Sequence, residues 1–329
     1  MVWLAIGVSF TILYILKYGF QGFLQQLVNG LQLGSLYALI ALGYTMVYGI
    51  IKLINFAHGD LFMFGAYISA FVGAYLAGRG LIGLAFIPAM LLSMIVTAVL
   101  GMSIEKVAYK PLRNKPRLSV LITALGVSLF LENFFALPAE KVFFPFNKIV
   151  FGPNMLSFPK LIDDRIFNFA GISISMVKSI DFFVAILLMI ILELIVKKTR
   201  IGKAMRAVSF NREAAYLMGI DVNFIIMVTF GIGTSLASAA GTLYALTFCC
   251  LDNPFMGIWP GMKAFIAAVL GGIGNIPGAM LGGFLMGIIE TYASSINPQL
   301  GDVSAFSLLI IVLIFKPAGL MGKFEIEKV

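Results

Sequence analysis

Long stretches without a charged side chain divide this chain into apolar blocks. Neither acidic nor basic residues occur in 18–51, 61–78, 80–104, 224–251 and 264–289. A helix needs about 20 mostly apolar residues to cross the hydrocarbon core of a bilayer. One such block could be a buried helix of a soluble protein, but five could not. The pattern therefore predicts an all-α fold, a polytopic bundle of transmembrane helices.

The blocks and the charged segments between them predict eight or nine spans. They lie near residues 22–50, 54–78, 81–104, 118–137, 180–196, 224–248, 264–292 and 303–316. The range 264–292 has Gly-Asn-Ile-Pro in its middle. Such a break leaves backbone groups unpaired, which membrane proteins tolerate only against protein or a water-lined cavity. We therefore expect at least one broken or re-entrant helix, and 264–292 crosses the membrane once or twice.

Composition agrees with lipid as the solvent. Hydrophobic residues make up 60% of the 329 residues and charged residues 12%, whereas about a quarter of a soluble domain is charged. The net charge of +8 is compatible with an acidic partner. Because Lys and Arg cluster in short loops, however, the charge is better explained by membrane topology, and we expect membrane lipid but no nucleic acid as a partner.

Two basic loops orient the predicted bundle. Residues 105–117 carry five basic side chains and one acidic one, and residues 197–213 carry six basic side chains and one acidic one. The positive-inside rule puts both loops in the cytoplasm, the second extending over 197–223. Since an even number of spans joins them, the segment 138–179 lies outside, where a soluble partner or substrate arrives.

We treat residues 1–329 as a single transmembrane domain. Residues 1–19 form either a first span or an interfacial segment, because they lack the basic start and cleavage site of a signal peptide. Cys249 and Cys250 are adjacent and give neither a disulfide framework nor a metal-ligand spacing. Gly34 to Leu39 resembles Gly241 to Leu246, which indicates either an internal repeat or a chance match.

The only histidine lies in a polar interruption between two apolar blocks. Asn55, His58, Gly59 and Asp60 follow closely on Lys52. Ionisable groups at membrane depth are costly and usually face a partner or a cavity, which favours a polar hinge beside a translocation path. Alternatively, Asn55 and Asp60 cap the next helix at the cytoplasmic boundary.

The chain shows no catalytic or metal-binding constellation. His58 and Asp60 have no serine, cysteine or metal-ligand partner at a recognisable spacing. We therefore expect no catalytic site, no metal site and no enzyme. Glu132, Glu193 and Glu290 lie within or at the ends of apolar stretches and are further candidates for a role inside the membrane.

Glycines recur four residues apart in the C-terminal third. Gly274, Gly278 and Gly282 form one such series, and Gly283 and Gly287 form another. This spacing favours close helix packing inside a bundle. Broken helices also expose backbone polar groups, so the break adds translocation-path candidates. They are Gly271, Gly272, Gly274, Asn275 and Pro277.

The second basic loop contains signals for a short helix. Asn211 suits the N-cap, Glu213 falls in the first turn and Gly219 suits the residue after the end. The enclosed two turns carry apolar side chains, namely Ala214, Ala215, Leu217 and Met218. So short a helix is unstable alone in water, so it packs on its own bundle or into a groove of a cytoplasmic protein.

No Gly-x-x-x-x-Gly-Lys-Ser/Thr sequence occurs, so we expect no ATP in a P-loop and no cofactor bound by this chain. Several ordered segments nevertheless share one resemblance. They are residues 29–49, 54–59, 109–113, 121–124, 206–221, 253–257, 263–265, 268–283 and 315–320. Together they resemble the LivH-type permease subunit of branched-chain amino acid ABC importers. Residues 1–19 and 138–179 fall outside the resemblance.

The resemblance implies a subunit of an ATP-driven importer for leucine, isoleucine and valine in the bacterial inner membrane. Its partners would be a homologous second permease subunit, two cytoplasmic ABC ATPases that use the ATP, and an external solute-binding protein. By the same resemblance, part of the second basic loop engages an ATPase. The implied residues are Arg206, Arg212, Glu213, Ala214, Ala215 and Gly219.

Other functions stay open at this stage. Urea and short-chain amide permeases share similar motifs, so the cargo is not settled. An ion-coupled secondary transporter requires ionisable groups near the middle of the membrane, and the longest predicted spans have none. An intramembrane hydrolase requires a nucleophile and base near His58, which the sequence does not supply.

Overall fold

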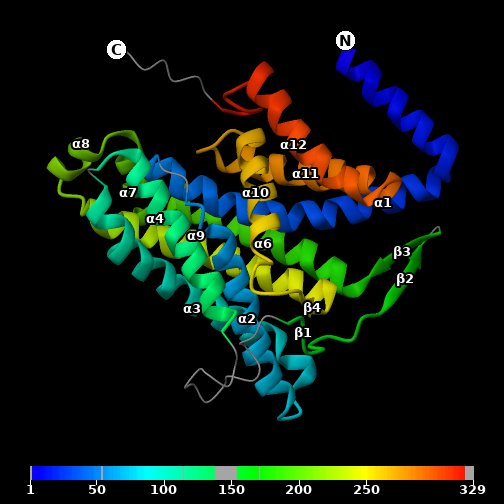
Figure 1. Cartoon of the computed structure of the whole chain (residues 1–329), viewed down its shortest axis with the longest axis horizontal. Helices are drawn as coiled ribbons and strands as arrows, with labels where there is room; N and C mark the ends of the chain where they lie inside the picture. Colours follow the sequence, from blue (N-terminus) through cyan, green and yellow to red (C-terminus); the bar gives the residue numbers. More distant parts are fainter. Residues whose placement is uncertain (1, 53–54, 114, 138–153, 170, 323–329) are drawn as a thin grey trace.

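The computed structural model describes residues 2–52, 55–113, 115–137, 154–169 and 171–322. Long helices dominate it, with two small two-stranded sheets (Figure 1). The elements are α1 Val2–Ile51, α2 His58–Ala77, η1 Ile82–Leu84, α3 Phe86–Ile104, η2 Glu105–Tyr109, η3 Lys110–Leu112, α4 Arg117–Phe135, β1 Leu156–Ser157, β2 Ile166–Phe169, β3 Ile172–Ser175, α6 Met176–Lys198, α7 Arg200–Phe210, α8 Arg212–Leu217, α9 Val222–Phe248, β4 Cys250–Leu251, α10 Ile258–Gly271, α11 Ile276–Ile296 and α12 Pro298–Phe315.

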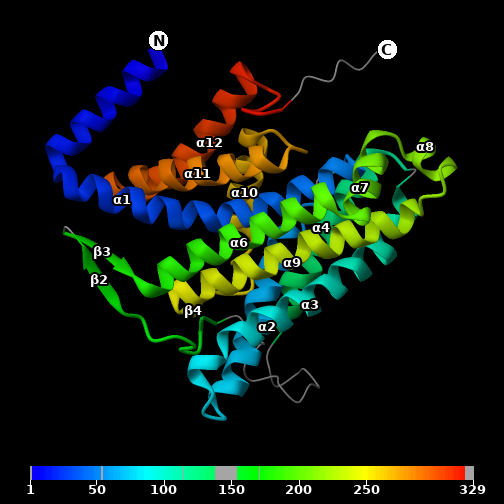
Figure 2. The same ribbon diagram turned by 180° about the vertical axis from the view of Figure 1, so that it is seen from behind.

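Eight of the described helices are long and apolar enough to cross a membrane, which confirms the predicted multi-pass bundle. They are α1, α2, α3 with its continuation to Leu112, α4, α6, α9, α11 and α12. Helix α1 extends far N-terminal of the predicted span and bends at Gly19, where φ is 76°. Residues 2–18 therefore continue as helix at an angle to the rest of α1 (Figure 2).

Glycines bring the central helices into backbone contact, as predicted. A Cβ on Gly278 or Gly282 would overlap carbonyl oxygens of α10, and one on Gly283 or Gly287 would overlap the backbone of α1. The two series thus serve two faces of α11, which lies between α10 and α1. Gly274 is outside the helix, with φ of 94°, so it belongs to the connecting turn.

The predicted break in 264–292 separates α10 from α11. Helix α10 has 14 residues and is about 21 Å long at 1.5 Å per residue, too short to cross a bilayer core of about 30 Å. The chain end completes the hydrogen bonds at the break: the amides of Leu320 and Met321 donate to the carbonyls of Leu270 (2.7 Å) and Gly271 (3.0 Å).

The all-α prediction holds for the bundle, but the segment predicted to be external contains the short strands β1, β2 and β3, which the sequence did not indicate. Strands β2 and β3 form an antiparallel hairpin, with Ile166 opposite Ser175, and β1 pairs with β4, with Leu156 opposite Leu251. The hairpin is fixed to α1 by Gln25, which bonds both backbone groups of Ser173. Residues 138–153 of the segment predicted to be external lie outside the described residues.

Candidate functional site

The second basic loop folds into a helical hairpin, α7 and α8, at the end of the bundle that also carries residues 105–113; we term this the basic end (Figure 1). No helix was predicted over 200–210, which the structure shows as α7. Thr199 caps α7 by accepting from the amide of Gly202 at 3.0 Å. Gly202, Met205 and Val208 face inward at a spacing of three, whereas Lys203 and Arg206 are exposed.

Helix α8 has the caps that the sequence indicates. The Asn211 side chain accepts from the amide of Ala214 at 3.0 Å, and Glu213 lies in the first turn. Gly219 has φ of 81°, and the amide of Ile220 donates to the carbonyl of Ala215 across it. A left-handed glycine after the last turn ends the helix in this way. Met218, expected inside the helix, is its C-cap residue.

The outer side of the hairpin is apolar. Only Ala215 of α8 is buried against the bundle. The exposed fractions of four large apolar side chains are 94% for Phe210, 72% for Tyr216, 83% for Leu217 and 83% for Met218. This protrusion lies at an end of the bundle where the neighbouring side chains are basic. Its position therefore does not suggest contact with lipid chains.

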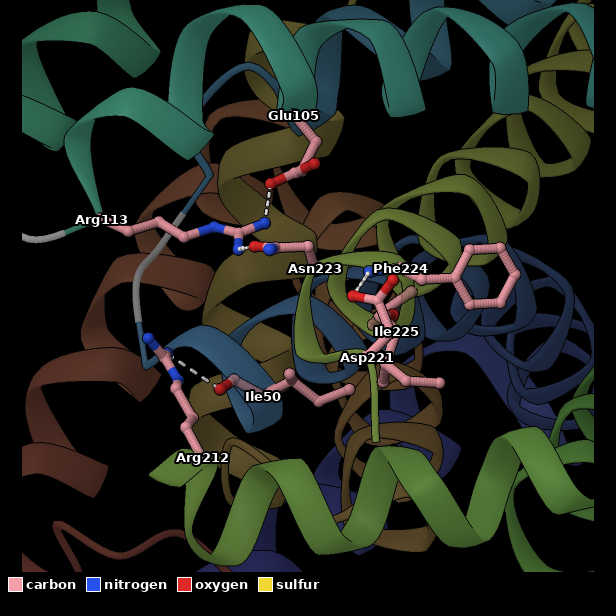
Figure 3. A network of polar contacts seen from close by, with 9 residues as sticks. Ile50, Glu105, Arg113, Arg212, Asp221, Asn223, Phe224 and Ile225 are labelled. Atoms are coloured by element: carbon pink, nitrogen blue, oxygen red, sulfur yellow. Dashed lines mark hydrogen bonds and ion pairs between the residues drawn. The ribbon is translucent and has the colours of Figure 1, made fainter. Parts of the chain in front are cut away.

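Arginines tie the hairpin and the first basic loop to the ends of the long helices (Figure 3). Arg212 donates to the carbonyl of Ile50 in the last turn of α1 at 3.0 Å. Burial, together with the positive charge of Arg113, lowers the pKa of the Arg212 guanidinium. Arg113 donates to Asn223 of α9 at 2.7 Å and pairs with Glu105. Arg206 donates to the carbonyl of Val196 at the end of α6.

The polar interruption at 55–60 lies deep inside the bundle. His58 is fully buried and lies against Gly43 of α1 and Gly233, which is near the middle of α9. Its ring centroid is 4.6 Å from that of Tyr44. Helix α2 therefore starts in the interior, so the alternative of a cap at the cytoplasmic boundary is wrong.

Neither Asn55 nor Asp60 is the N-cap residue of α2. That residue is Ala57, which makes no side-chain cap. Asn55 instead turns the chain: its Oδ1 accepts from the amide of Ala57 (3.1 Å) and from the Tyr109 hydroxyl (2.6 Å). Asp60 lies in the first turn of α2 and is 2% exposed.

A second helix begins at the same place. The backbones of Gly59 and Gly257 are in contact, since a Cβ on either would overlap the carbonyl oxygen of the other. Helix α10 starts at Ile258, directly after Gly257. Two helix N-termini thus meet inside the bundle, and each contributes a positive partial charge.

A cavity of about 320 Å³ lies beside this meeting point. Its lining comes from α1, the start of α2, α4 and the start of α10. The lining residues are Tyr44, Phe56, Gly59, Asp60, Leu125, Ser128, Leu129, Glu132, Gly257, Ile258, Gly261, Met262 and Phe265. The sequence indicated Gly59, Asp60 and Glu132 among these. It missed the α10 residues, although Asn-x-x-x-Gly occurs at both 55–59 and 253–257.

The other path candidates lie elsewhere. Gly271, Gly272, Gly274, Asn275 and Pro277 do not line this cavity. Gly271 ends α10, Pro277 lies in the first turn of α11, and the other three lie between the two helices. There Asn275 caps α11 by accepting from the amide of Gly278 at 3.1 Å. Gly274 lies near Gly49, which is close to the end of α1. It therefore lies at the basic end of the bundle.

The two remaining glutamates have cationic partners. Glu193 pairs with Lys197 one turn later on the exposed side of α6. Glu290 of α11 pairs with Lys263 of α10 at 2.6 Å, and Lys263 also reaches Asp302 of α12 at 2.7 Å. This ion group, in which Lys263 and Glu290 are buried, fastens the half-length α10 to its two neighbours.

Comparison with known proteins gives one consistent result. The family model described as "Branched-chain amino acid transport system / permease component" matches residues 26–314. The high-affinity branched-chain amino acid transport system permease protein BraD of Pseudomonas aeruginosa is 46% identical over 310 residues, covering 93% of this chain and 98% of its own length. The corresponding LivH of Escherichia coli K12 is 42% identical over 319 residues, with the same coverages. These relatives are transport permeases and not enzymes. The solved structure of PsaBC from Streptococcus pneumoniae in complex with Fab is 14% identical, with a TM-score of 0.44 and coverages of 94% and 97%.

Proposed function

Since this chain belongs to the family of permease components of branched-chain amino acid transport systems, we propose that it is the membrane-spanning subunit of an ATP-driven importer for leucine, isoleucine and valine. The named activities of the relatives support the substrate class. The structural observation that carries the proposal is the apolar protrusion on the α7–α8 hairpin. We further propose the bacterial inner membrane as its location.

The hairpin is the contact for a cytoplasmic ATPase. Burying a large apolar side chain is worth about 1.5–3 kcal/mol relative to leaving it in water. Phe210, Leu217 and Met218 are almost fully exposed, so a groove on a partner gains most from this surface. Glu213, Ala214 and Gly219 lie on the same exposed loop and fix the shape and charge of what enters the groove.

Movement of the hairpin reaches the interior through two helices. Arg212 holds it to the end of α1, and α8 leads directly through Asp221 into α9. Further along, α1 contributes Tyr44 to the cavity, and α9 packs at Gly233 beside His58. ATP binding in the partner thereby shifts the helices that enclose the cavity. Such coupling requires that the partner bind two states of the permease differently.

The remaining partners follow from the importer class. We propose a homologous second permease subunit, two ABC ATPases and an external solute-binding protein. ATP is bound by the ATPases, and this chain binds no cofactor. The translocation path runs by Asn55, His58, Gly59 and Asp60, where the two helix N-termini meet. The segment 271–277 contributes to the same path only at the basic end of the bundle.

The test is uptake of labelled leucine by vesicles that contain the chain, the candidate second permease and ATPases, with the binding protein added outside. We expect uptake to require ATP. We also expect Glu213→Lys and Leu217→Asp to release the ATPase during purification, because each puts an unpaired charge into the contact. Asp163→Lys changes an exposed acid at the opposite end and serves as the control that retains the ATPase.

Each alternative predicts a different result. Leucine uptake without ATP would contradict an importer and favour an ion-coupled secondary transporter. ATP-driven uptake of urea or short amides in place of leucine would show that the importer carries a different substrate. Full retention of the ATPase by both hairpin variants would show that the contact lies elsewhere.

A further inference from the structure

Five acidic side chains are buried in the described part of the chain. Glu105 pairs with Arg113, and Glu290 pairs with Lys263. Asp181 of α6 accepts from Gln32 and Thr247. The other two, Asp60 and Glu132, take part in no ion pair among the described residues.

These two carboxyl groups share the interior cavity. Asp60 comes from the first turn of α2 and Glu132 from the last turns of α4, and both line the space. They are 2% and 3% exposed. Oδ2 of Asp60 has no hydrogen-bond partner in the described structure, while the Asp60 carboxyl group also interacts with the side chains of Ser128 and Glu132.

Neither Asp60 nor Glu132 has a cationic partner among the described residues. Two neighbouring carboxylates repel one another, and burial makes each charge more costly. A positive group between them removes both costs and gains charge-assisted hydrogen bonds. The rings of Tyr44, Phe56 and Phe265 line the same space, and aromatic faces attract cations as well.

The rest of the cavity fits an aliphatic chain and a carboxylate. Leu125, Leu129 and Met262 provide apolar walls. Gly257 and Ile258 put the N-terminus of α10 at the lining, where its dipole favours a negative group. The volume, about 320 Å³, lies at the lower end of the range for small-molecule sites, roughly 300–1,000 Å³.

We infer that this cavity binds the transported aliphatic amino acid inside the permease, with Asp60 and Glu132 holding its ammonium group. The inference rests on the proposed function and assigns the substrate contact to named residues. The carboxylate lies at the start of α10, and the side chain lies against α4. The open side is at the exposed Leu129 and Ile258, so substrate enters and leaves between α4 and α10.

Direct binding tests the inference apart from uptake. Labelled leucine is added to the detergent-purified complex of permease and ATPase subunits, without the binding protein. Isoamylamine, which is leucine without its carboxylate, is expected to compete. Isocaproate, which is leucine without its ammonium group, is expected not to compete. Asp60→Asn and Glu132→Gln are each expected to weaken leucine binding about tenfold or more, because each removes a charge-assisted bond.

Two further variants keep the result interpretable. Asp181→Asn alters a buried acid that does not line the cavity and is expected to bind leucine as wild type does. Leu129→Trp leaves both carboxyl groups in place and fills the open side from an exposed position, so it is expected to reduce binding without unfolding the chain. Complex assembly and ATPase activity are measured for every variant.

The outcomes separate this site from the proposed function. If wild type imports leucine with ATP but the Asp60→Asn, Glu132→Gln double variant binds and imports it unchanged, the site is wrong and the importer stands. Competition by isocaproate and not by isoamylamine would also overturn the ammonium assignment. If wild type imports no leucine at all, the proposed function itself fails.

Discussion

Two short turns in this molecule share a sequence pattern and differ in their surroundings. The α2 turn is Asn55-Phe-Ala-His-Gly59, and the α10 turn is Asn253-Pro-Phe-Met-Gly257. In each, the asparagine side chain accepts from the amide two residues later, at 3.1 Å and 2.8 Å. In each, the asparagine carbonyl accepts from the amide three residues later, at 3.2 Å and 3.0 Å.

The turns approach from opposite ends of the bundle and meet at their glycines. Helix α1 ends at the basic end and precedes the α2 turn, whereas α9 starts at that end and precedes the α10 turn. Asn55 is 4% exposed and needs the Tyr109 hydroxyl as an extra partner. Asn253 is half-buried and has no such side-chain partner among the described residues. The same turn thus costs more inside the bundle, where water cannot complete its hydrogen bonds.

The largest effect is expected where the two turns touch. Gly257→Val puts side-chain atoms into the Gly59 carbonyl, and neither backbone can yield without moving a helix start. We expect a loss of at least about 3 kcal/mol in the free energy of unfolding, measured by denaturant unfolding in detergent. Gly126→Ala in α4 is the control, because nothing lies within 4 Å of its Cβ position; it is expected to stabilise the helix by about 0.5–1 kcal/mol. Equal stability of the two variants would contradict the close contact.

The asparagines are expected to differ next. Asn55→Ala leaves the buried Tyr109 hydroxyl without its acceptor and removes the turn, so it should cost about 2–3 kcal/mol. Asn253→Ala removes the same turn where water replaces the bond, so it should cost about 1 kcal/mol or less. Both are measured by the same unfolding assay. Equal costs would mean that burial does not separate the two turns.

A smaller effect isolates the extra partner of Asn55. Tyr109→Phe removes one buried hydrogen bond of 2.6 Å and keeps the ring beside that of Phe230. The expected cost is about 1 kcal/mol in the wild-type background. It should disappear in Asn55→Ala, where the acceptor is already gone. An undiminished cost in that background would assign it to packing.

The smallest effect concerns Cys250, just before the α10 turn. Burial and the nearby negative charge of Asp252 raise the pKa of the Cys250 thiol, whose Sγ is 3.5 Å from that carboxylate. Asp252→Asn should therefore lower this pKa. At pH values below the thiol pKa, we expect alkylation by maleimide to become about twofold faster. The measurement uses Cys249→Gly as background, since position 249 has φ of 55°. An unchanged rate would show that the charge of Asp252 does not reach the thiol.

The sequence predicts the spans and the caps of α8 because both depend on local patterns. Uncharged blocks identify helices that are apolar enough to cross a membrane, and Asn211 and Gly219 act on amides within a few residues. Helix α7 was not predicted in this way. Lys203 and Arg206 make its sequence polar, and its inward side consists only of Gly202, Met205 and Val208.

Local sequence patterns could not predict how deep a residue lies inside the bundle. The alternative of a cap at the cytoplasmic boundary followed from the closeness of Lys52 in the sequence, yet His58 lies beside Gly43 of α1, well before that helix ends. The meeting of Gly59 with Gly257 likewise depends on two distant segments. The repeat between Gly34–Leu39 and Gly241–Leu246 stays a prediction; since α1 and α9 run in opposite directions, such a repeat would be inverted.

The hydrogen bonds between the chain end and the turn after α10 have a consequence for biosynthesis. The carbonyls of Leu270 and Gly271 are completed by Leu320 and Met321, and Asn275 donates to the Met321 carbonyl. The ribosome makes these partners only after α11 and α12 have been translated. Until then, the C-terminal end of α10, at the basic end of the bundle, lacks these hydrogen-bond partners. The turn between α10 and α11 is therefore completed only after α12 has been made.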